Sequence, residues 1–170
     1  MKFFYIIFIS LSLNLLSSDL TNLFNTYIEN SNISFTQSSI NPYSNTIDKS
    51  EGRIIQNNNN KVIYIDAPFR EKYELTKDKI IITDLELDQQ SEILREDLSN
   101  NLIMDIFING ISKNNSYYEI HSSEDKIVIS PILETGYSDI EVKFKNKKIY
   151  YLKYNDNLNI ENLIFLKLDI

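Results

Sequence analysis

The feature that most constrains the fold is an alternation of apolar and polar residues in the middle of the chain. Between Glu51 and Asp84, short runs of Ile, Val, Tyr and Leu are separated roughly every ten residues by clusters of Asn, Asp, Lys and Pro. Phe69, Tyr73 and Leu75 share one parity, whereas lysine and glutamate occupy the other. A period of two is typical of a strand with one buried face. The stretch therefore predicts an antiparallel meander.

Four consecutive asparagines, Asn57–Asn60, interrupt this meander. Asparagine tolerates the left-handed backbone of a tight hairpin, so the run is a candidate turn. Codon bias in a chain rich in Asn and Ile is an equally good explanation. Both interpretations leave the meander in place.

The first eighteen residues have the composition of a secretory signal peptide. A positive start at Met1-Lys2 precedes an apolar run from Phe3 to Leu16, which is shorter than the roughly 20 residues of a membrane span. Small residues follow, so we expect cleavage near Ser17 or Ser18. A retained membrane anchor is the alternative. The predicted organisation is a signal peptide over residues 1–18 and one domain over residues 19–170.

Two segments have the periodicity of amphipathic helices. The first, Asp19–Asn30, places apolar residues at helical spacing. The second is predicted over Asn100–Ile108, with Ser99 as its cap and Gly110 as its stop. The apolar stripe of the first helix comprises Leu20, Leu23, Phe24, Tyr27 and Ile28, and that of the second Leu102, Ile103, Ile106 and Phe107.

The remaining chain is read mainly as strands. A first strand is expected at Ile33–Ile40, followed by a polar loop to Ser50, and the two-residue rhythm is lost from Ser91 to Ile111. Later strands are predicted at Tyr117–His121, Lys126–Ser130, Asp139–Phe144, Lys148–Tyr154 and Asn162–Leu168. About ten evenly spaced strands predict a mainly β (α+β) fold, either an up-and-down barrel or a strongly curved antiparallel sheet.

The inventory of reactive residues argues against catalysis. The chain has no cysteine and one histidine, His121, so it lacks the residues for a zinc site or for a Cys/His nucleophile pair. We expect no enzyme activity, no metal and no cofactor. A formal net charge of −7 also disfavours nucleic acid and anionic membrane surfaces as ligands.

Apolar surface is abundant for an open sheet, given eleven tyrosines and nine phenylalanines. In one interpretation the helices and the sheet fill one another. In the other they enclose a space for an apolar ligand, as larger antiparallel barrels do. The pattern alone leaves both open.

A series of short motifs resembles the LolA family of periplasmic outer-membrane lipoprotein carriers. The motifs follow in order after the signal peptide and first helix: Phe35-Thr36-Gln37, Glu51-Gly52, the strand from Tyr64 to Pro68, Lys79, and Asp84…Leu87…Gln89. The chain departs from the family pattern in two motifs. The family's Arg-Pro falls in Asn57–Asn60 and its Trp is Tyr64, and the Pro of the later motif is Leu85. The role of that arginine in lipoprotein handover is therefore not carried over.

The resemblance implies an incomplete antiparallel β-barrel with a helical lid over an apolar cavity. Its ligands would be the acyl chains of lipoproteins, received from an inner-membrane ABC-type releasing complex and delivered to an outer-membrane acceptor. The protein would act in the periplasm, and we expect a monomer.

Parity and motif position together predict the residues of this cavity. Parity selects Tyr73, Val142 and Phe144, and motif position selects Phe35 and Tyr64. The full predicted lining is Phe35, Tyr64, Tyr73, Ile82, Phe107, Val142 and Phe144, and the predicted lid residues are Leu20, Leu23, Phe24, Leu102, Ile103 and Ile106. The alternatives are another periplasmic lipid-binding or lipoprotein-sensing domain, and a structural or adhesive domain without a ligand.

Overall fold

A computed structural model describes residues 20–29, 32–57, 60–76, 78–94, 102–114, 116–132 and 138–168, which form one antiparallel sheet of 11 strands and two helices. The first six strands are β1 (Ile33–Asn41), β2 (Thr46–Asn57), β3 (Asn60–Ala67), β4 (Glu71–Leu75), β5 (Lys79–Asp84) and β6 (Gln89–Leu94). The last five are β7 (Tyr118–Ser122), β8 (Lys126–Pro131), β9 (Ile140–Lys145), β10 (Lys148–Asn155) and β11 (Glu161–Leu168).

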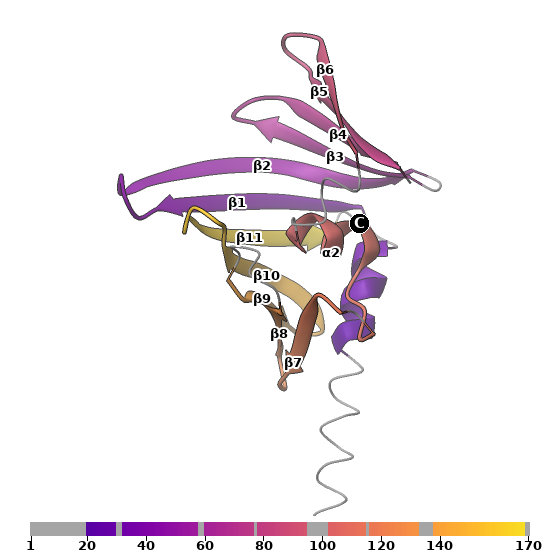
Figure 1. The fold of residues 1–170 in the computed structure, drawn as a ribbon, viewed down its shortest axis with the longest axis vertical. Coiled ribbons are helices and arrows are strands. Elements are labelled where there is room, and N and C mark those ends of the chain that lie inside the picture. Colours follow the sequence, from indigo (N-terminus) through magenta and orange to yellow (C-terminus); the bar gives the residue numbers. More distant parts are fainter. Residues whose placement is uncertain are drawn as a thin grey trace, which may run out of the picture.

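The strand order explains why the sheet is curved and not closed. It runs β6-β5-β4-β3-β2-β1-β11-β10-β9-β8-β7, so two meanders meet where β1 pairs with β11. In the described part of the chain, β6 and β7 are the two free edges. Figure 1 shows the resulting bent sheet. The predicted mainly β fold, an incomplete barrel with helices over it, is confirmed.

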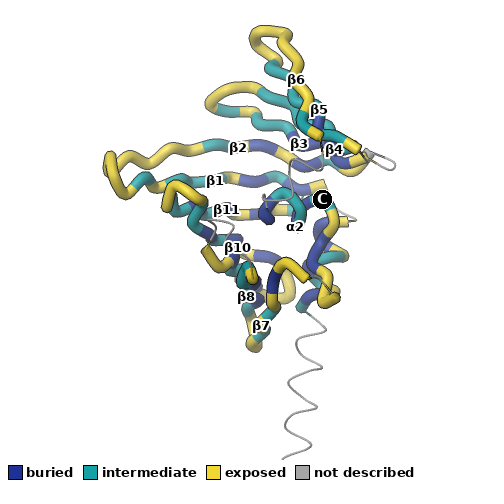
Figure 2. Tube along the Cα trace, in the orientation of Figure 1, coloured by how far each residue is buried: buried dark blue, intermediate teal, exposed yellow. Residues whose placement is uncertain are grey.

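Both helices lie inside the curve of the sheet (Figure 1). The first spans residues 20–29, and α2 spans Leu102–Asn109. Phe24 and Ile106, one from each helix, are 0% exposed, and they belong to the same core cluster as the inner faces of the strands. Buried residues gather where helices and sheet meet, whereas the ends of the β1–β2 and β5–β6 hairpins are exposed (Figure 2). The core therefore lies on the concave side of the sheet.

Three hairpin turns are stabilised in the same way, by a side-chain carboxylate or amide oxygen that accepts hydrogen bonds from backbone N–H groups. Asn41 accepts from Tyr43 N (2.9 Å) in the β1–β2 turn. The Oδ1 of Asp84 accepts from Glu86 N and Leu87 N in the β5–β6 turn, and Asp156 has the same role before β11. Asn and Asp favour such turns because their short side chains reach the backbone two residues ahead.

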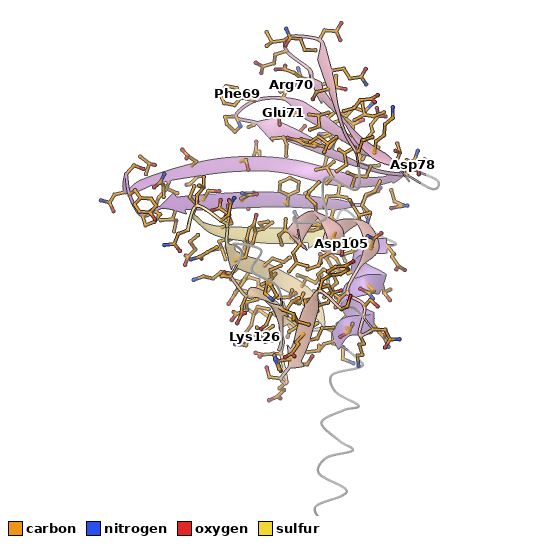
Figure 3. All side chains as sticks on the ribbon, viewed as in Figure 1. Phe69, Arg70, Glu71, Asp78, Asp105 and Lys126 are labelled. Atoms are coloured by element: carbon orange, nitrogen blue, oxygen red, sulfur yellow. The ribbon has the colours of Figure 1, made fainter. Side chains whose placement is uncertain are left out.

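Several predicted boundaries need correction. The expected loop up to Ser50 is strand from Thr46, and the segment that lost its rhythm after Ser91 begins as the second half of β6. Both were missed for one reason: residues 46–49 and most of β6 are exposed on both faces, so no apolar alternation marks them. Phe69 is 70% exposed in the turn between β3 and β4, away from α2 (Figure 3), and does not share the buried face of Leu75.

The first helix begins at residue 20 and ends at residue 29 in the described chain, so the predicted ends Asp19 and Asn30 lie outside the described residues. The same applies to the signal-peptide prediction for residues 1–18 and to the predicted cap Ser99. The stop at Gly110 agrees with the structure. Gly110 has φ +73°, and its N–H donates to the carbonyl of Ile106 (2.9 Å), as in a left-handed helix C-cap.

Candidate functional site

An apolar cavity of about 280 Å³ lies between α2 and the centre of the sheet. It is open on one side, and β1–β4, β10, β11 and α2 all contribute to it. Its size is just below the roughly 300–1,000 Å³ of typical small-molecule pockets. The lining residues are Phe35, Gln37, Ile54, Ile63, Ile65, Tyr73, Ile103, Met104, Phe107, Tyr154, Ile164 and Leu166.

The position of Phe35 in the cavity wall depends on a glycine. Phe35 pairs with Gly52 on β2, and a Cβ on Gly52 would lie 2.7 Å from the Phe35 ring and 2.1 Å from the carbonyl oxygen of Tyr64. Neither distance is compatible with a side chain. Gly52 therefore allows both the Phe35 ring and the β3 backbone to approach β2 closely, in the way that an aromatic ring covers a cross-strand glycine.

A small polar network lies at the Gln37 side of the cavity. The Nε2 of Gln37 donates to Ser39 Oγ and to Asn162 Oδ1, both at 3.0 Å. Ser39 Oγ also donates to Asn162 Oδ1 (2.7 Å), and Asn162 Nδ2 donates to the carbonyl of Ile160. The network ties β1 to β11. Asn162 is only 4% exposed, and these bonds satisfy its amide.

Tyr73 supplies the second polar group of the lining. Its hydroxyl donates to Glu71 Oε2 at 2.6 Å. Burial, together with the Glu71 carboxylate, raises the pKa of the Tyr73 phenol above its ordinary value. Tyr73 therefore stays neutral at physiological pH and presents its ring to the cavity.

A buried lysine on β3 holds the C-terminal end of α2. Lys61 is 8% exposed, and its Nζ donates to the carbonyl of Phe107 in the last turn of the helix (2.5 Å). The last turn of α2 has no basic residue of its own, so Lys61 supplies the cation that complements the helix dipole. Burial lowers the pKa of the Lys61 ammonium, and the nearby Glu29 carboxylate opposes this shift.

A second anchor follows immediately after α2. Asn25 of the first helix accepts from Ile111 N (2.8 Å) and donates to the carbonyl of the same residue (2.9 Å). Gly110 passes so close that a Cβ there would lie 2.7 Å from Asn25 Oδ1. The C-terminal end of α2 is thus fixed to both β3 and the first helix.

Three of the seven predicted lining residues border the cavity: Phe35, Tyr73 and Phe107. They come from β1, β4 and α2, so the fold brings together residues that are far apart in the sequence. That these side chains contact a ligand remains a prediction.

Tyr64 lies on the other face of the sheet, which corrects the expectation drawn from its motif position. Its β3 neighbours Ile63 and Ile65 line the cavity, and strand alternation turns Tyr64 away. Its ring lies under the guanidinium of Arg53, 4.7 Å from Arg53 Cζ, and Arg53 in turn pairs with Asp66.

The other three predicted residues lie beside or beyond the cavity. Ile82 pairs with Tyr73 and packs against the core one strand further out. Val142 and Phe144 are 0% and 4% exposed on β9, in the core, and do not line the cavity. Their parity was read correctly as buried, but a buried face does not distinguish filled core from cavity wall.

The predicted lid residues divide in the same way. Ile103 lines the cavity, while Leu102, Ile106 and Phe24 are buried in the core. Leu20 and Leu23 are half-buried and pack against that core. Among the described elements only α2 provides lid side chains to this cavity.

Sequence reasoning missed most of the lining. Most of the missed residues lie on β1 itself or on strands that pair with β1 or β4, where a period of two becomes informative only once the pairing is known; Tyr154 on β10 and Met104 on α2 lack this signal. The missed residues are Gln37, Ile54, Ile63, Ile65, Met104, Tyr154, Ile164 and Leu166.

The described residues contain no group of three or more His, Asp or Glu arranged to hold a metal. His121 is exposed on β7, 3.6 Å from Glu119. No helix in the described part of the chain has the length and apolarity needed to cross a membrane. What the arrangement offers chemically is apolar contact.

No family model matches the chain, and none of the curated proteins matches it. Solved structures do. The Pseudomonas aeruginosa MucA/MucB complex matches with a TM-score of 0.50 and 9% identity, over 91% of this chain and 57% of that chain. A LolA superfamily protein from Nitrosomonas europaea matches with a TM-score of 0.46 and 10% identity, over 89% and 91%. A putative outer membrane lipoprotein-sorting protein domain from Vibrio parahaemolyticus gives 0.42 and 8%, over 91% of each.

At such low identities these likenesses show the fold alone. The chain spans little more than half of the MucA/MucB complex chain that it matches.

Proposed function

We propose that this protein is a periplasmic carrier that binds the acyl chains of lipoproteins and moves them from the inner to the outer membrane. The observation that carries the proposal is the apolar cavity between α2 and the sheet. It offers no charged clamp, because none of its lining residues carries a charge, and the polar side chains of Gln37 and Tyr73 bond to neighbouring residues. Such a site binds alkyl chains and also releases them.

The energetics require shielding of this kind. Three acyl chains contain roughly 45 methylenes, and at about 0.8 kcal/mol each their exposure to water costs about 36 kcal/mol. A lipoprotein therefore does not cross an aqueous compartment unaided. A carrier that covers only part of the chains already removes much of this cost.

The cavity is small compared with a complete acyl chain. If a methylene takes about the volume of a water molecule, roughly 30 Å³, then 280 Å³ holds only about nine methylenes. One complete acyl chain exceeds this. Since the C-terminal end of α2 is anchored by Lys61 and Asn25, we propose that the helix swings about that end to enlarge the cavity.

The location and partners follow from the same proposal. Residues 1–18 would direct secretion and be removed. The donor would be an inner-membrane ABC-type complex, and the recipient an outer-membrane acceptor. The protein would act by binding, without enzyme activity and without a cofactor.

A second candidate is a domain that senses lipoproteins or lipids. One observation favours it: the solved structure with the TM-score of 0.50 is a complex of two proteins, MucA and MucB. In a sensor, filling the cavity would change the affinity for a protein partner. In a carrier, filling is itself the function.

Purification from the periplasm without detergent, followed by mass spectrometry of the native protein, tests the proposal. A carrier is expected to retain acylated protein, or to remove it from inner-membrane vesicles when added to them. Bound free lipid without any lipoprotein would favour the sensor. Absence of both, in a folded protein that also takes up no added lipopeptide, would overturn the proposal.

A further inference from the structure

The β9–β10 hairpin concentrates positive charge in an acidic protein. The segment Glu141–Asn155 holds five lysines and one glutamate, a net +4, in a chain whose formal net charge is −7. Two of these lysines are neutralised: Lys143 pairs with Asp125 and Lys153 with Glu161, both at 2.6 Å. The other three lie at the hairpin turn, where no described carboxylate forms an ion pair with them; they are Lys145, Lys147 and Lys148.

An aromatic cluster adjoins these lysines on the outer face. The pairing of β9 with β10 shifts register between Ile149 and Tyr151, which leaves Tyr150 and Tyr151 both outside while Ile149 is buried. Their rings pack with Phe165 of β11, with centroids 5.6–6.2 Å apart. Tyr150 is 46% and Phe165 36% exposed.

One lysine connects the two features. The Nζ of Lys145 lies 5.5 Å from the centroid of the Tyr150 ring. The hydroxyl of Tyr151 donates to Glu141 (2.7 Å), which orients the second ring. The outer face of the hairpin thus presents aromatic rings, with the Lys145 ammonium over the ring of Tyr150.

The turn itself does not explain its lysine. Asn146 and Lys147 both have left-handed backbone, with φ of 53° and 58°. This two-residue turn favours Asn-Gly, because glycine avoids the Cβ clash at the second position. Lys147 occupies the position where glycine would fit best, so turn geometry alone disfavours it.

We propose that the β9–β10 hairpin docks the protein on the anionic phospholipid surface of a bilayer. Lysine is a point charge that attracts phosphate without fixed geometry, whereas arginine recognises carboxylates and phosphates through its planar fork. The segment Glu141–Asn155 has lysine and no arginine. Tyrosine and lysine both favour a membrane–water interface, because each has an apolar body and a polar tip. An acidic protein surface is the competing occupant.

The overall acidity does not prevent such docking. Beyond about 8 Å at physiological ionic strength, exposed charges are largely screened. The acidic remainder of the molecule therefore acts weakly on the surface, and the lysines act at contact.

Co-sedimentation of the secreted, processed protein with lipid vesicles tests this inference. Vesicles of phosphatidylethanolamine with phosphatidylglycerol are compared with vesicles of phosphatidylcholine alone, at low and at high salt. We expect binding to the anionic vesicles, lost at high salt. Loss of one hairpin lysine should weaken it about fivefold, and Tyr150→Ser should weaken it without a change of charge.

Lys147→Gly separates docking from folding. It should weaken vesicle binding about fivefold while the melting temperature stays equal or rises, because glycine suits the turn. The double variant Lys147→Gly/Lys148→Gln should bind about 25-fold more weakly. The matched control, Lys49→Gln/Lys113→Gln, removes two exposed lysines elsewhere and should bind like the parent protein.

Equal binding to both kinds of vesicle, no binding to either, or equal losses in the control would overturn the inference. If the hairpin served an acidic protein instead, the anionic vesicles would not bind. The vesicles contain no lipoprotein, so the result is independent of the proposed cargo. A variant with a damaged cavity, such as Ile65→Glu, should still bind them.

Discussion

Two neighbouring residues of β3 give the sharpest test of where an acyl chain lies. Ile65 lines the cavity, whereas Tyr64 is on the opposite face beside Arg53 and opposite Lys72. We predict that Ile65→Glu abolishes acyl-chain binding and that Tyr64→Glu leaves it nearly unchanged. Glutamate is therefore introduced at two adjacent positions that lie on opposite faces of the sheet.

The magnitude follows from the two environments. Losing the isoleucine contact removes about 2 kcal/mol of apolar burial. Placing a carboxyl group against methylenes costs about 2 kcal/mol more. The sum of about 4 kcal/mol corresponds to roughly a thousandfold weaker binding. At position 64 the new carboxylate meets Arg53 and Lys72, so binding should change by no more than about twofold.

The assay is fluorescence anisotropy of a monoacylated lipopeptide that carries its fluorophore on the peptide. Circular dichroism of each variant reports whether the fold is intact. Ile65 is half-buried at the open cavity, so Ile65→Glu should fold without ligand. Equal affinities of the two folded variants, or a larger loss in Tyr64→Glu, would refute the assignment of faces and of the cavity.

Three further predictions concern the structure around the cavity. Gly52→Ala should lower the free energy of unfolding, measured by urea denaturation, by about 3 kcal/mol. Because the 2.1 Å contact is with the Tyr64 backbone, adding Phe35→Leu should restore less than half of the lost stability, and full restoration would contradict this. Asn25→Ala removes both hydrogen bonds to Ile111 and should lower the free energy of unfolding by about 2 kcal/mol, and Asn25→Asp should lower it by about half as much. Equal melting temperatures of the parent and the two variants would show that this contact does not anchor α2. Relative to Lys61→Met, the parent protein should become more stable as the pH rises toward 10.5. The pKa of Lys61 is lower in the folded than in the unfolded protein, so the unfolded chain binds more protons between these two pKa values. A stability difference that does not change with pH would exclude a lowered pKa.

The meander was predictable because each central strand buries one face. Tyr73 and Leu75, and likewise Val142 and Phe144, follow the period of two that burial imposes. Strands without a buried face lack this signal, so the start of β2 and all of β6 were missed. The alternation of apolar and polar residues indicates burial, and it therefore predicts only those strands that have a buried face.

The cavity was harder to predict than the core. Val142 and Phe35 look alike in the sequence, since both are apolar residues on a buried strand face. Which of them borders the cavity depends on where α2 lies across the sheet, a long-range property of the fold. The Tyr64 prediction came from a motif position and overrode the parity of its neighbours Ile63 and Ile65.

The anchors of α2 were also invisible in the sequence. Lys61 follows the asparagine run and looks like an exposed turn lysine, yet it is buried and bonds to Phe107, 46 residues away. Asn25 resembles any polar residue of an amphipathic helix, although it pairs with the backbone of Ile111. Side-chain-to-backbone bonds over such separations have no local pattern.

The most direct measurement of the central claim is photolabelling with a lipopeptide whose acyl chain carries a diazirine. After irradiation, mass spectrometry of the digested protein identifies the labelled residues. The cavity assignment predicts label on β3, α2 and β11, at residues such as Ile65, Met104 and Ile164, and its loss when unlabelled lipopeptide competes. Label confined to the outer face or to the β5–β6 hairpin, or label that competition does not reduce, would contradict it.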